Sequence, residues 1–380
     1  MKKTSLKKIT TLIFIGILFG FFIINLVVPD RKFSAAENRS LQEFPRFNAS
    51  QYIEGRYMKK LENYANDQFV GRGVFVRIKS ALDLSIGKNE ANGVYLGHDG
   101  YLIEEIKDPD MKRFTAREKA LTEFKSSYPN INMYFLLAPN AGNIMREKLP
   151  FAAQNADQNK YMDDFFKALR AGGFYTIDVR EDFEHAKKDA QLYYRTDHHW
   201  TGNGAYIAYK DAVKTMGAGE PIEYSPHLVK NDFKGSLYSK SGFVNGKNDS
   251  IWIWLPKDGS GKLDSVIFYP DTKKKTTEFY RLKNLSIKDA YSVFGGTNHP
   301  MYKIETPVKS NKRLLVIKDS YANSLVPLLA PHYRSIVVVD PRYYFEDIDD
   351  LIESEGITDI LFLYNANTLF NDDSLTMALE

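Results

Sequence analysis

The pattern of apolar and polar residues changes twice along this 380-residue chain. Residues 9–28 form one uninterrupted apolar run, whereas residues 57–69 and 73–86 carry apolar side chains at helical spacing. From residue 93 onwards, short apolar stretches alternate with amphipathic ones. These textures predict a membrane-spanning segment, a helical membrane-proximal stalk over residues 30–92 and an α/β domain over residues 93–380.

The apolar run predicts a transmembrane helix. Its 20 uncharged residues, Ile9 to Val28, would span about 30 Å, the thickness of a hydrocarbon core, at about 1.5 Å per residue. Lysines precede the run, so the positive-inside tendency places the N-terminus in the cytoplasm and everything after Pro29 outside. We therefore expect residues 1–29 to be a cytoplasmic tail and signal anchor of a single-pass protein of the cell membrane.

A cleaved signal peptide is the alternative. Ser34-Ala35-Ala36 supplies small residues of the required type, but they lie beyond the charged residues 30–32, and the apolar run is long for a signal peptide. Both alternatives place the main domain outside the cytoplasm, which argues against chemistry that depends on ATP, NAD or acetyl-CoA.

Apolar strands separated by helical stretches indicate the fold of the main domain. Strands are expected at 133–139, 174–179, 313–317, 335–340 and 359–364, and helices at 110–128, 157–171, 321–331 and 346–355. Such strands are typical of a parallel sheet with helices on both faces. A hairpin over 93–102, turning at His98-Asp99-Gly100, precedes them. Residues 231–305 instead predict an antiparallel β insertion, because their strands are alternating or aromatic.

Composition narrows the chemistry. The chain has no cysteine, which excludes a thiol nucleophile, a disulfide framework and a cysteine-based metal site. Its net charge of +3 is accounted for by the lysines at positions 2, 3, 7 and 8. The rest of the chain has no excess positive charge and gives no electrostatic case for nucleic-acid binding.

Two segments carry the candidate chemistry, YYRTDHHW at 193–200 and LLVIKDSYANS at 314–324. Ser320 follows an apolar strand and precedes a helical stretch, where α/β enzymes place nucleophiles and backbone N–H groups can stabilise an oxyanion. A serine hydroxyl needs a base, and that base needs a partner that fixes its tautomer. Asp197 and His199 lie two apart and point the same way on extended backbone, so we expect a triad of Asp197, His199 and Ser320.

Other interpretations stay open on these residues alone. A serine after a strand is more often a helix cap than a nucleophile. The Asp-His-His cluster could bind a metal ion, although the remaining histidines are not spaced as ligands, and we expect neither a metal nor a cofactor. His198 competes with His199 as the base. Asp319 is expected to form the turn, since its side chain should point away from that of Ser320.

The string Asp197-His198-His199-Trp200, followed by Gly204 and by KDSYANS downstream, resembles the DHHW family. It is similar also to the alginate acetylation proteins AlgJ and AlgX, which carry an SGNH-hydrolase-like domain. Three further stretches occur in family order: ENRSLQEFP (37–45), GVYLGHDGYL (93–102) and DFKGSL (232–237). The resemblance implies an SGNH-hydrolase-like, flavodoxin-like fold.

The resemblance also implies a circular permutation, because ordinary SGNH enzymes carry the serine block first and this chain carries it last. Residues 320, 340–341 and 364–365 would end successive strands as the Ser, Gly and Asn blocks. Residues 133–139 and the Asp197 region would then be the last two strands, moved to the front.

By this mapping Asn365 or Asn367 would occupy the oxyanion position. Lys318, His198 and Trp200 are the other oxyanion or substrate candidates. Residues 340–341 contain no glycine, and Lys318 replaces the glycine usual before Asp-Ser, so the composition of the oxyanion hole departs from the family pattern.

For function, the resemblance implies an extracytoplasmic O-acetyltransferase, or an acetylesterase, acting on a cell-surface or exported polysaccharide through an acetyl-serine intermediate. It implies a membrane-bound O-acyltransferase as the partner that passes acetyl groups across the membrane. The alternatives are a non-catalytic polysaccharide-binding or assembly component with the same fold, and a metal-dependent hydrolase built on His198 and His199.

Overall fold

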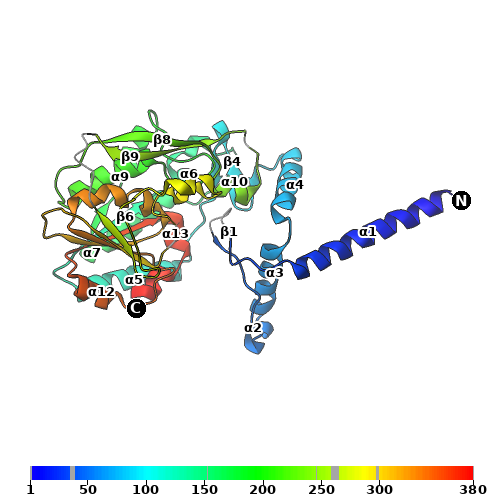
Figure 1. Cartoon of the computed structure of the whole chain (residues 1–380), viewed down its shortest axis with the longest axis horizontal. Helices are drawn as coiled ribbons and strands as arrows, with labels where there is room; N and C mark the ends of the chain where they lie inside the picture. The colour runs from blue at the N-terminus through cyan, green and yellow to red at the C-terminus, as the bar shows by residue number, and fades with distance from the viewer. Residues whose placement is uncertain are drawn as a thin grey trace.

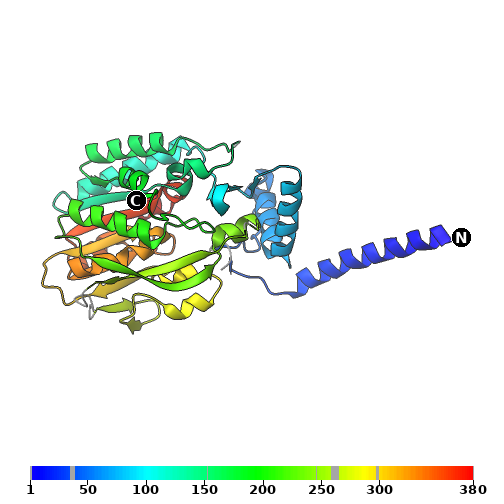
Figure 2. The same ribbon diagram turned by 90° about the horizontal axis from the view of Figure 1, so that it is seen from above.

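The computed structural model describes residues 2–34, 39–151, 153–244, 246–257, 265–296 and 299–379. A long N-terminal helix projects from the molecule, and three helices lie between it and the main domain (Figures 1 and 2). These are α1 (Lys2–Val27), α2 (Ala49–Ile53), α3 (Arg56–Gln68) and α4 (Arg72–Ser85). Strands β1 (Phe33–Ser34) and β2 (Arg39–Ser40) pair with each other.

Helix α1 contains the predicted transmembrane run. Residues Lys7–Val27 are long and apolar enough to cross a membrane, and none of this segment is buried against the protein. Length and composition thus agree with a single-pass anchor, while its topology stays a prediction. Ala35 and Ala36 of the alternative cleavage site lie outside the described residues.

An eight-stranded mixed sheet forms the centre of the main domain, in the order β11-β10-β12-β14-β13-β15-β6-β7. Five neighbouring strands are parallel: β14 (Ser335–Val339), β13 (Arg313–Lys318), β15 (Asp359–Asn365), β6 (Asn132–Ala138) and β7 (Tyr175–Ile177). Three antiparallel strands extend it: β12 (Met301–Glu305), β10 (Val266–Tyr269) and β11 (Lys274–Thr276). The predicted α/β fold with a parallel sheet is therefore confirmed, with an antiparallel extension at one edge.

Alternate residues of each central strand face opposite layers of helices, as the pleat requires. One layer packs on Leu314 and Val316 of β13 and is made of α8 (Arg180–Ala186), α9 (Gly202–Thr215) and α11 (Val326–Leu329). The other packs on Leu315 and Ile317 and is made of α5 (Met111–Ser127), α7 (Gln158–Ala171), α12 (Ile348–Glu355), α13 (Ala366–Asn371) and α14 (Ser374–Leu379). Both faces of the sheet are thus buried, which explains the continuous apolar strands.

The remaining elements lie around this sheet. Strands β3 (Glu90–Ala91), β4 (Val94–Leu96) and β5 (Leu102–Glu104) form a small antiparallel sheet that includes the predicted hairpin, with Asp99 at positive φ in its turn. The short helices are α6 (Ala141–Ile144), α10 (Ser236–Ser241), η1 (His98–Gly100), η2 (Arg146–Lys148), η3 (Leu282–Ser286), η4 (Ala290–Val293), η5 (Ser320–Ser324) and η6 (Ala330–His332).

The segment predicted as an antiparallel insertion divides into two parts. Strands β8 (Tyr224–Phe233) and β9 (Asp249–Pro256) form a separate two-stranded sheet. Strands β10 to β12 instead extend the main sheet. The strands are antiparallel as predicted, but the first begins at Tyr224, before residue 231, and three of the five join the central sheet.

Two other sequence expectations differ from the structure. The single helix expected over 321–331 is broken into η5, α11 and η6, because Pro327 and Pro331 lack the N–H that a continuous helix needs. The strand at the edge of the sheet is β7, whereas Asp197 lies in a turn closed by a bridge between Tyr193 and Trp200. The Asp197 region is therefore not a strand of the main sheet, and the circular permutation stays a prediction.

Candidate active site

Asp197, His199 and Ser320 form one hydrogen-bonded chain. The Ser320 hydroxyl lies 2.7 Å from His199 Nε2, and His199 Nδ1 lies 2.6 Å from Asp197 Oδ1. All three are buried, and Ser320 keeps 8% of its surface exposed. This is the geometry that lets a histidine accept a serine proton while a carboxylate fixes its tautomer.

The end of strand β13 presents Ser320 at the carboxyl edge of the sheet. Ser320 is the first residue of η5, and the preceding Asp319 fixes this turn. Asp319 Oδ1 accepts the Tyr321 N–H at 2.9 Å, and its Oδ2 accepts the N–H of Asn365 on the neighbouring strand at 2.8 Å. The turn-forming role predicted for Asp319 is confirmed.

The start of α10 holds the carboxylate of Asp197. Its Oδ2 accepts the Ser236 N–H at 2.7 Å, and its Oδ1 accepts the backbone N–H of His199 at 3.0 Å. Gly235 packs against it so closely that a Cβ there would lie 2.3 Å from both Cβ and Oδ2 of Asp197. Two residues of the DFKGSL stretch therefore support the site directly. Gly235 leaves space for the Asp197 side chain, and Ser236 donates its backbone N–H to the Asp197 carboxylate.

Tyr291 stacks on the imidazole of His199. The ring centroids are 3.7 Å apart and the planes differ by 8°. The Tyr291 hydroxyl donates to the backbone oxygen of Ser320 at 3.3 Å, so one side chain contacts both His199 and the serine segment. Sequence reasoning missed this residue, because a lone tyrosine 92 positions from His199 carries no motif.

Electrostatics favour a neutral His199 and an ionised Asp197. Burial, reinforced by the neighbouring His198, lowers the pKa of His199 to about 4, with Asp197 acting in the opposite direction. Burial alone would raise the pKa of Asp197, but the two histidines and the Ser236 N–H overcome it and hold that pKa well below its ordinary value. At neutral pH the histidine is therefore free to accept a proton.

His198 and Trp200 occupy different positions beside the triad. His198 is partly exposed, and its Nδ1 is hydrogen-bonded to the Ser236 hydroxyl at 2.7 Å. Trp200 is fully buried, and its indole N–H is shared between the Tyr321 carbonyl at 3.1 Å and the Ser324 hydroxyl at 2.9 Å. Trp200 thus ties the DHHW turn to η5, and His199 alone of the two histidines contacts Ser320.

The predicted oxyanion candidates are engaged elsewhere. The Asn365 side chain caps α13 and bonds to Asn140 at 3.0 Å, while the Asn367 amide donates to the Glu105 carbonyl at 3.2 Å. Lys318 is buried and ion-paired with Asp340 at 3.1 Å. An oxyanion role for any of them stays a prediction.

The cluster of Asp197, His198 and His199 could alternatively bind a metal ion. Asp197, His198 and His199 each offer a ligand atom, and these atoms lie within 4.8 Å of one another. Both ring nitrogens of His199 are already hydrogen-bonded, to Asp197 and to Ser320. A cation held by all three residues would have to displace one of those two bonds, so the geometry fits the triad better.

Asp289 is a second carboxyl group near the triad that sequence reasoning missed. It precedes η4, two residues before Tyr291. Burial, together with the negative charge of Asp197, raises the pKa of Asp289 to about 7, against a smaller opposing effect of His198. Asp289 therefore titrates close to neutral pH.

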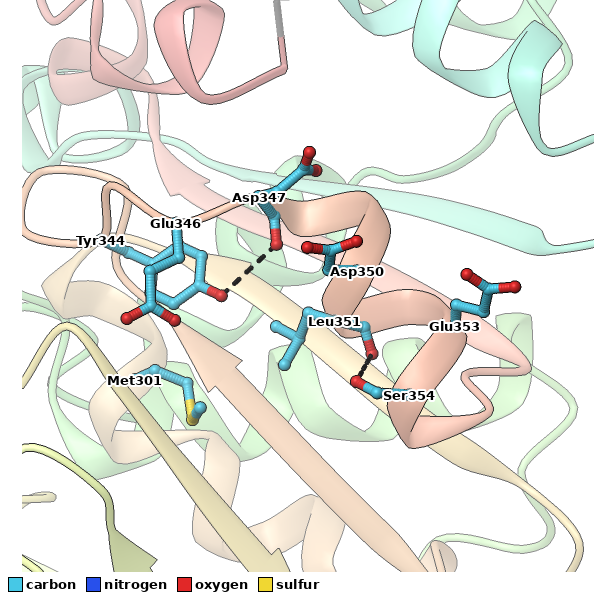
Figure 3. Close-up of a pocket in the computed structure, with 8 residues that line it drawn as sticks. All are labelled: Met301, Tyr344, Glu346, Asp347, Asp350, Leu351, Glu353 and Ser354. Carbon is cyan, nitrogen blue, oxygen red and sulfur yellow. Dashed lines mark hydrogen bonds between the residues drawn. The ribbon is translucent and has the colours of Figure 1, made fainter.

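A separate hollow of about 430 Å³ lies against α12 and contains none of the predicted site residues (Figure 3). Its lining includes four acidic residues, Glu346, Asp347, Asp350 and Glu353, whose carboxylates do not converge on one point. Nothing in this arrangement indicates a reaction.

Comparisons with known proteins confirm the resemblance seen in the sequence. The family described as "SGNH hydrolase-like domain, acetyltransferase AlgX" matches residues 94–232, and the family described as "DHHW protein" matches residues 167–339. The probable alginate O-acetylase AlgJ of Pseudomonas putida is 22% identical over 276 residues, which cover 70% of this chain and 65% of that protein. AlgJ of Pseudomonas fluorescens is 24% identical over 182 residues, covering 46% of each. The chain thus spans from about half to two thirds of the length of these two relatives.

Solved structures share the fold. A DHHW family protein from Eubacterium siraeum has a TM-score of 0.63 at 24% identity, covering 76% of this chain and 95% of that one. PatB1 of Bacillus cereus, in a structure with a sulfonyl adduct, has a TM-score of 0.61 at 23% identity, covering 74% of this chain and 98% of that one. At these identities the likeness establishes the fold alone.

Proposed function

We propose that this protein is a serine-dependent O-acetyltransferase, or the corresponding acetylesterase, that acts on an exported or cell-surface polysaccharide. The observation that carries the proposal is the continuous hydrogen-bonded chain from Asp197 through His199 to the Ser320 hydroxyl. The relatedness to alginate O-acetylases supports acetyl groups and a polysaccharide as the two reactants.

In the first half-reaction, Ser320 Oγ attacks the carbonyl carbon of an acetyl donor while His199 Nε2 takes the serine proton. Asp197 stabilises the resulting imidazolium through the bond to Nδ1–H. The tetrahedral intermediate then collapses, the donor alcohol leaves with the proton from Nε2, and acetyl-Ser320 remains. The backbone N–H of Ser320 is the donor nearest in sequence to the developing oxyanion, because the N–H of Tyr321 already donates to Asp319 Oδ1.

In the second half-reaction, a sugar hydroxyl attacks the acetyl carbonyl and gives its proton to His199 Nε2. Collapse expels Ser320 Oγ, which recovers that proton, and the product is the O-acetylated sugar. If water attacks instead, acetate leaves and the enzyme acts as an esterase. The balance between the two outcomes depends on whether an acceptor sugar displaces water beside Ser320.

The expected setting of this reaction is the outer face of a membrane, with α1 as anchor. Ser320 would there receive acetyl groups from a membrane-bound O-acyltransferase. The apolar segment Lys7–Val27 supports the anchor. The partner is supported by the implied location alone, since free acetyl-CoA is not available outside the cytoplasm.

Turnover of 4-nitrophenyl acetate by the purified full-length protein in detergent tests the proposal. We expect nitrophenolate release by the wild type and a loss of at least about a thousandfold in Ser320→Ala and His199→Ala, because the nucleophile and base act as a unit. Thermal unfolding of each variant checks that it is folded. A folded wild-type protein that hydrolyses no activated ester but binds glycan would instead be a non-catalytic component.

A further inference from the structure

A basic pocket of about 400 Å³ lies between α4, α10 and the end of strand β8. Among its described lining residues four are basic, Arg77, Lys230, Lys234 and Lys288, and one is acidic, Asp232. Lys230 pairs with Asp232 at 2.6 Å, and Arg77 and Lys234 alone then give the pocket a net positive charge. Cations held this close together repel one another, and an anion placed among them relieves that repulsion.

Two of these cations lie beside the aromatic ring of Tyr238. The Arg77 guanidinium carbon lies 5.5 Å and Lys234 Nζ lies 4.8 Å from the centroid of its ring. Within the described part of the chain, neither cation lies within salt-bridge distance of a carboxylate. Their N–H donors can therefore reach an incoming oxyanion without breaking an ion pair.

The pocket adjoins the triad through a short stretch of chain. Lys234 immediately precedes Gly235 and Ser236, which contact the Asp197 carboxylate. Arg77 reaches the pocket from α4, which lies beside α10 (Figure 1) and is tied to it by the hydrogen bond from Ser80 to the Ser241 carbonyl. A long polymer that crosses the triad can thus contact both α10 and the membrane-proximal helices.

A second pocket nearby, of about 370 Å³, provides an internal comparison. It includes Lys240 of α10, which pairs with Glu104 at 2.7 Å, and Lys107, which pairs with Glu105 at 3.4 Å. Its described charges are therefore balanced. The positive charge is a property of the basic pocket and not of the whole surface around α10.

We propose that the basic pocket binds a negatively charged group of the acceptor polysaccharide, a carboxylate or a phosphate, and so holds the chain while a neighbouring sugar hydroxyl reaches Ser320. This inference rests on the proposed function for the identity of the acceptor. Charge complementarity supports an anionic polymer, because a neutral sugar would leave the charges of Arg77 and Lys234 uncompensated. The short path from Lys234 to Asp197 favours a substrate over a lipid head group.

Equilibrium binding tests the pocket separately from the chemistry. Fluorescently labelled hexamannuronate and a neutral cellohexaose are titrated into full-length Ser320→Ala protein in detergent, so that binding is measured whether or not the triad turns over. We expect the anionic probe to bind more tightly, to weaken as salt is raised, and to lose about tenfold in affinity in Lys234→Ala and more in Lys234→Glu. Arg77→Ala, which removes the other cation beside the Tyr238 ring, should act in the same direction. Inorganic pyrophosphate should compete.

Lys107→Ala is the matched control, since it removes an exposed lysine from the charge-balanced pocket, and its affinity should stay within about twofold of the parent. Equal losses in Lys107→Ala and Lys234→Ala, or equal binding of the two hexasaccharides, would overturn the inference. So would pocket-dependent binding of dihexanoyl phosphatidylglycerol without binding of hexamannuronate, which would make the pocket a lipid site. Failure of the proposed function would appear instead as absent ester turnover in the wild type with hexamannuronate binding intact.

Discussion

His199 is restrained on three sides by residues that differ in what they contribute. Asp197 fixes its tautomer, Ser320 occupies the other ring nitrogen, and Tyr291 lies flat on the ring. An aromatic face next to an imidazole limits its rotation and stabilises the charge that it gains when it takes a proton. Positioning by Tyr291 should therefore be visible in kcat.

Replacing Tyr291 separates its ring from its hydroxyl. Tyr291→Phe keeps the stack and loses only the long bonds to Ser320 and Ser324, so we expect kcat to stay within a few fold. Tyr291→Leu removes the stack, and a base free to move by about 1 Å is expected to lower kcat by about 100-fold. Ester hydrolysis measured beside thermal unfolding distinguishes the two. A phenylalanine variant as inactive as the leucine variant would show that the hydroxyl matters more than the stack.

The pH profile reports the charge of His199. Only the neutral ring can accept the serine proton, and burial lowers its pKa from 6.5 to about 4. Protonation, and with it loss of activity, should therefore occur below the ordinary range of histidine. We expect kcat/KM for 4-nitrophenyl acetate to remain nearly constant from pH 8 to pH 5 and to fall below that. An acid limb centred at or above 6.5 would contradict this.

Asp289 should make stability depend on pH. Its pKa is raised from 3.8 to about 7 in the folded protein, so the folded state binds more protons than the unfolded state between these values, and stability falls as pH rises through that window. Asp289→Asn removes the buried charge. We expect the free energy of unfolding of the variant, relative to that of the wild type, to be higher at pH 8 than at pH 5. The difference should be on the order of 2 kcal/mol. Thermal unfolding at both pH values measures this, and a gain independent of pH would exclude the titration.

Residue identities predicted the triad better than they predicted its surroundings. Ser320 and the pair Asp197 and His199 carry motifs, and the structure brings these three side chains together. Tyr291 and Asp289 reach the site only because η4 packs against the DHHW turn, a tertiary contact without a local signal. The family resemblance suggests Asn365 or Asn367 for the oxyanion position, and in the structure the Asn365 side chain caps the next helix.

At the scale of the elements, the residue just before α10 has no space for a side chain. A Cβ on Gly235 would collide with the Asp197 side chain. Gly235→Ala should therefore displace the carboxylate from His199 and lower kcat by about 100-fold, with a loss of about 1–3 kcal/mol in stability from overpacking.

The control for this substitution is Gly73→Ala in α4, where no atom lies within 4 Å of the added Cβ. Alanine there should leave kcat unchanged and stabilise the helix by up to about 1 kcal/mol. Steady-state ester hydrolysis and thermal unfolding compare the two. Wild-type activity in Gly235→Ala would show that the Asp197 carboxylate tolerates movement.

The positions of strands that are buried on both faces of the sheet can be predicted from the sequence, because their apolar runs are continuous. The strands β6, β13, β14 and β15 lie where the sequence placed them. The way in which β10 to β12 join the main sheet was not predictable, because strand partners depend on contacts distant in sequence. Likewise the hydrophobic pattern over 321–331 suggests one helix, and the two prolines together with the tight turn at Ser320 divide it.

At the scale of the whole molecule, we expect α1 to determine where the proposed reaction occurs. An uncleaved helix of this length should hold the protein in the bilayer. We expect the chain to stay in the membrane fraction after an alkaline carbonate wash, and its intact mass to include residues 1–29. A mature chain that begins after Ala36 and is released by the wash would support the signal peptide instead.

The central claim is that acetyl groups pass through Ser320, and the acetyl-enzyme itself tests it most directly. Full-length protein is mixed with 4-nitrophenyl acetate, quenched in acid within the first turnover, digested and analysed by mass spectrometry. We predict one acetyl group on the peptide that contains Ser320 in the wild type, and none on that peptide in Ser320→Ala. The group should disappear when the quench is delayed until the ester is consumed. Turnover of the ester with no acetylated Ser320, or with the acetyl group on another residue, would contradict the account.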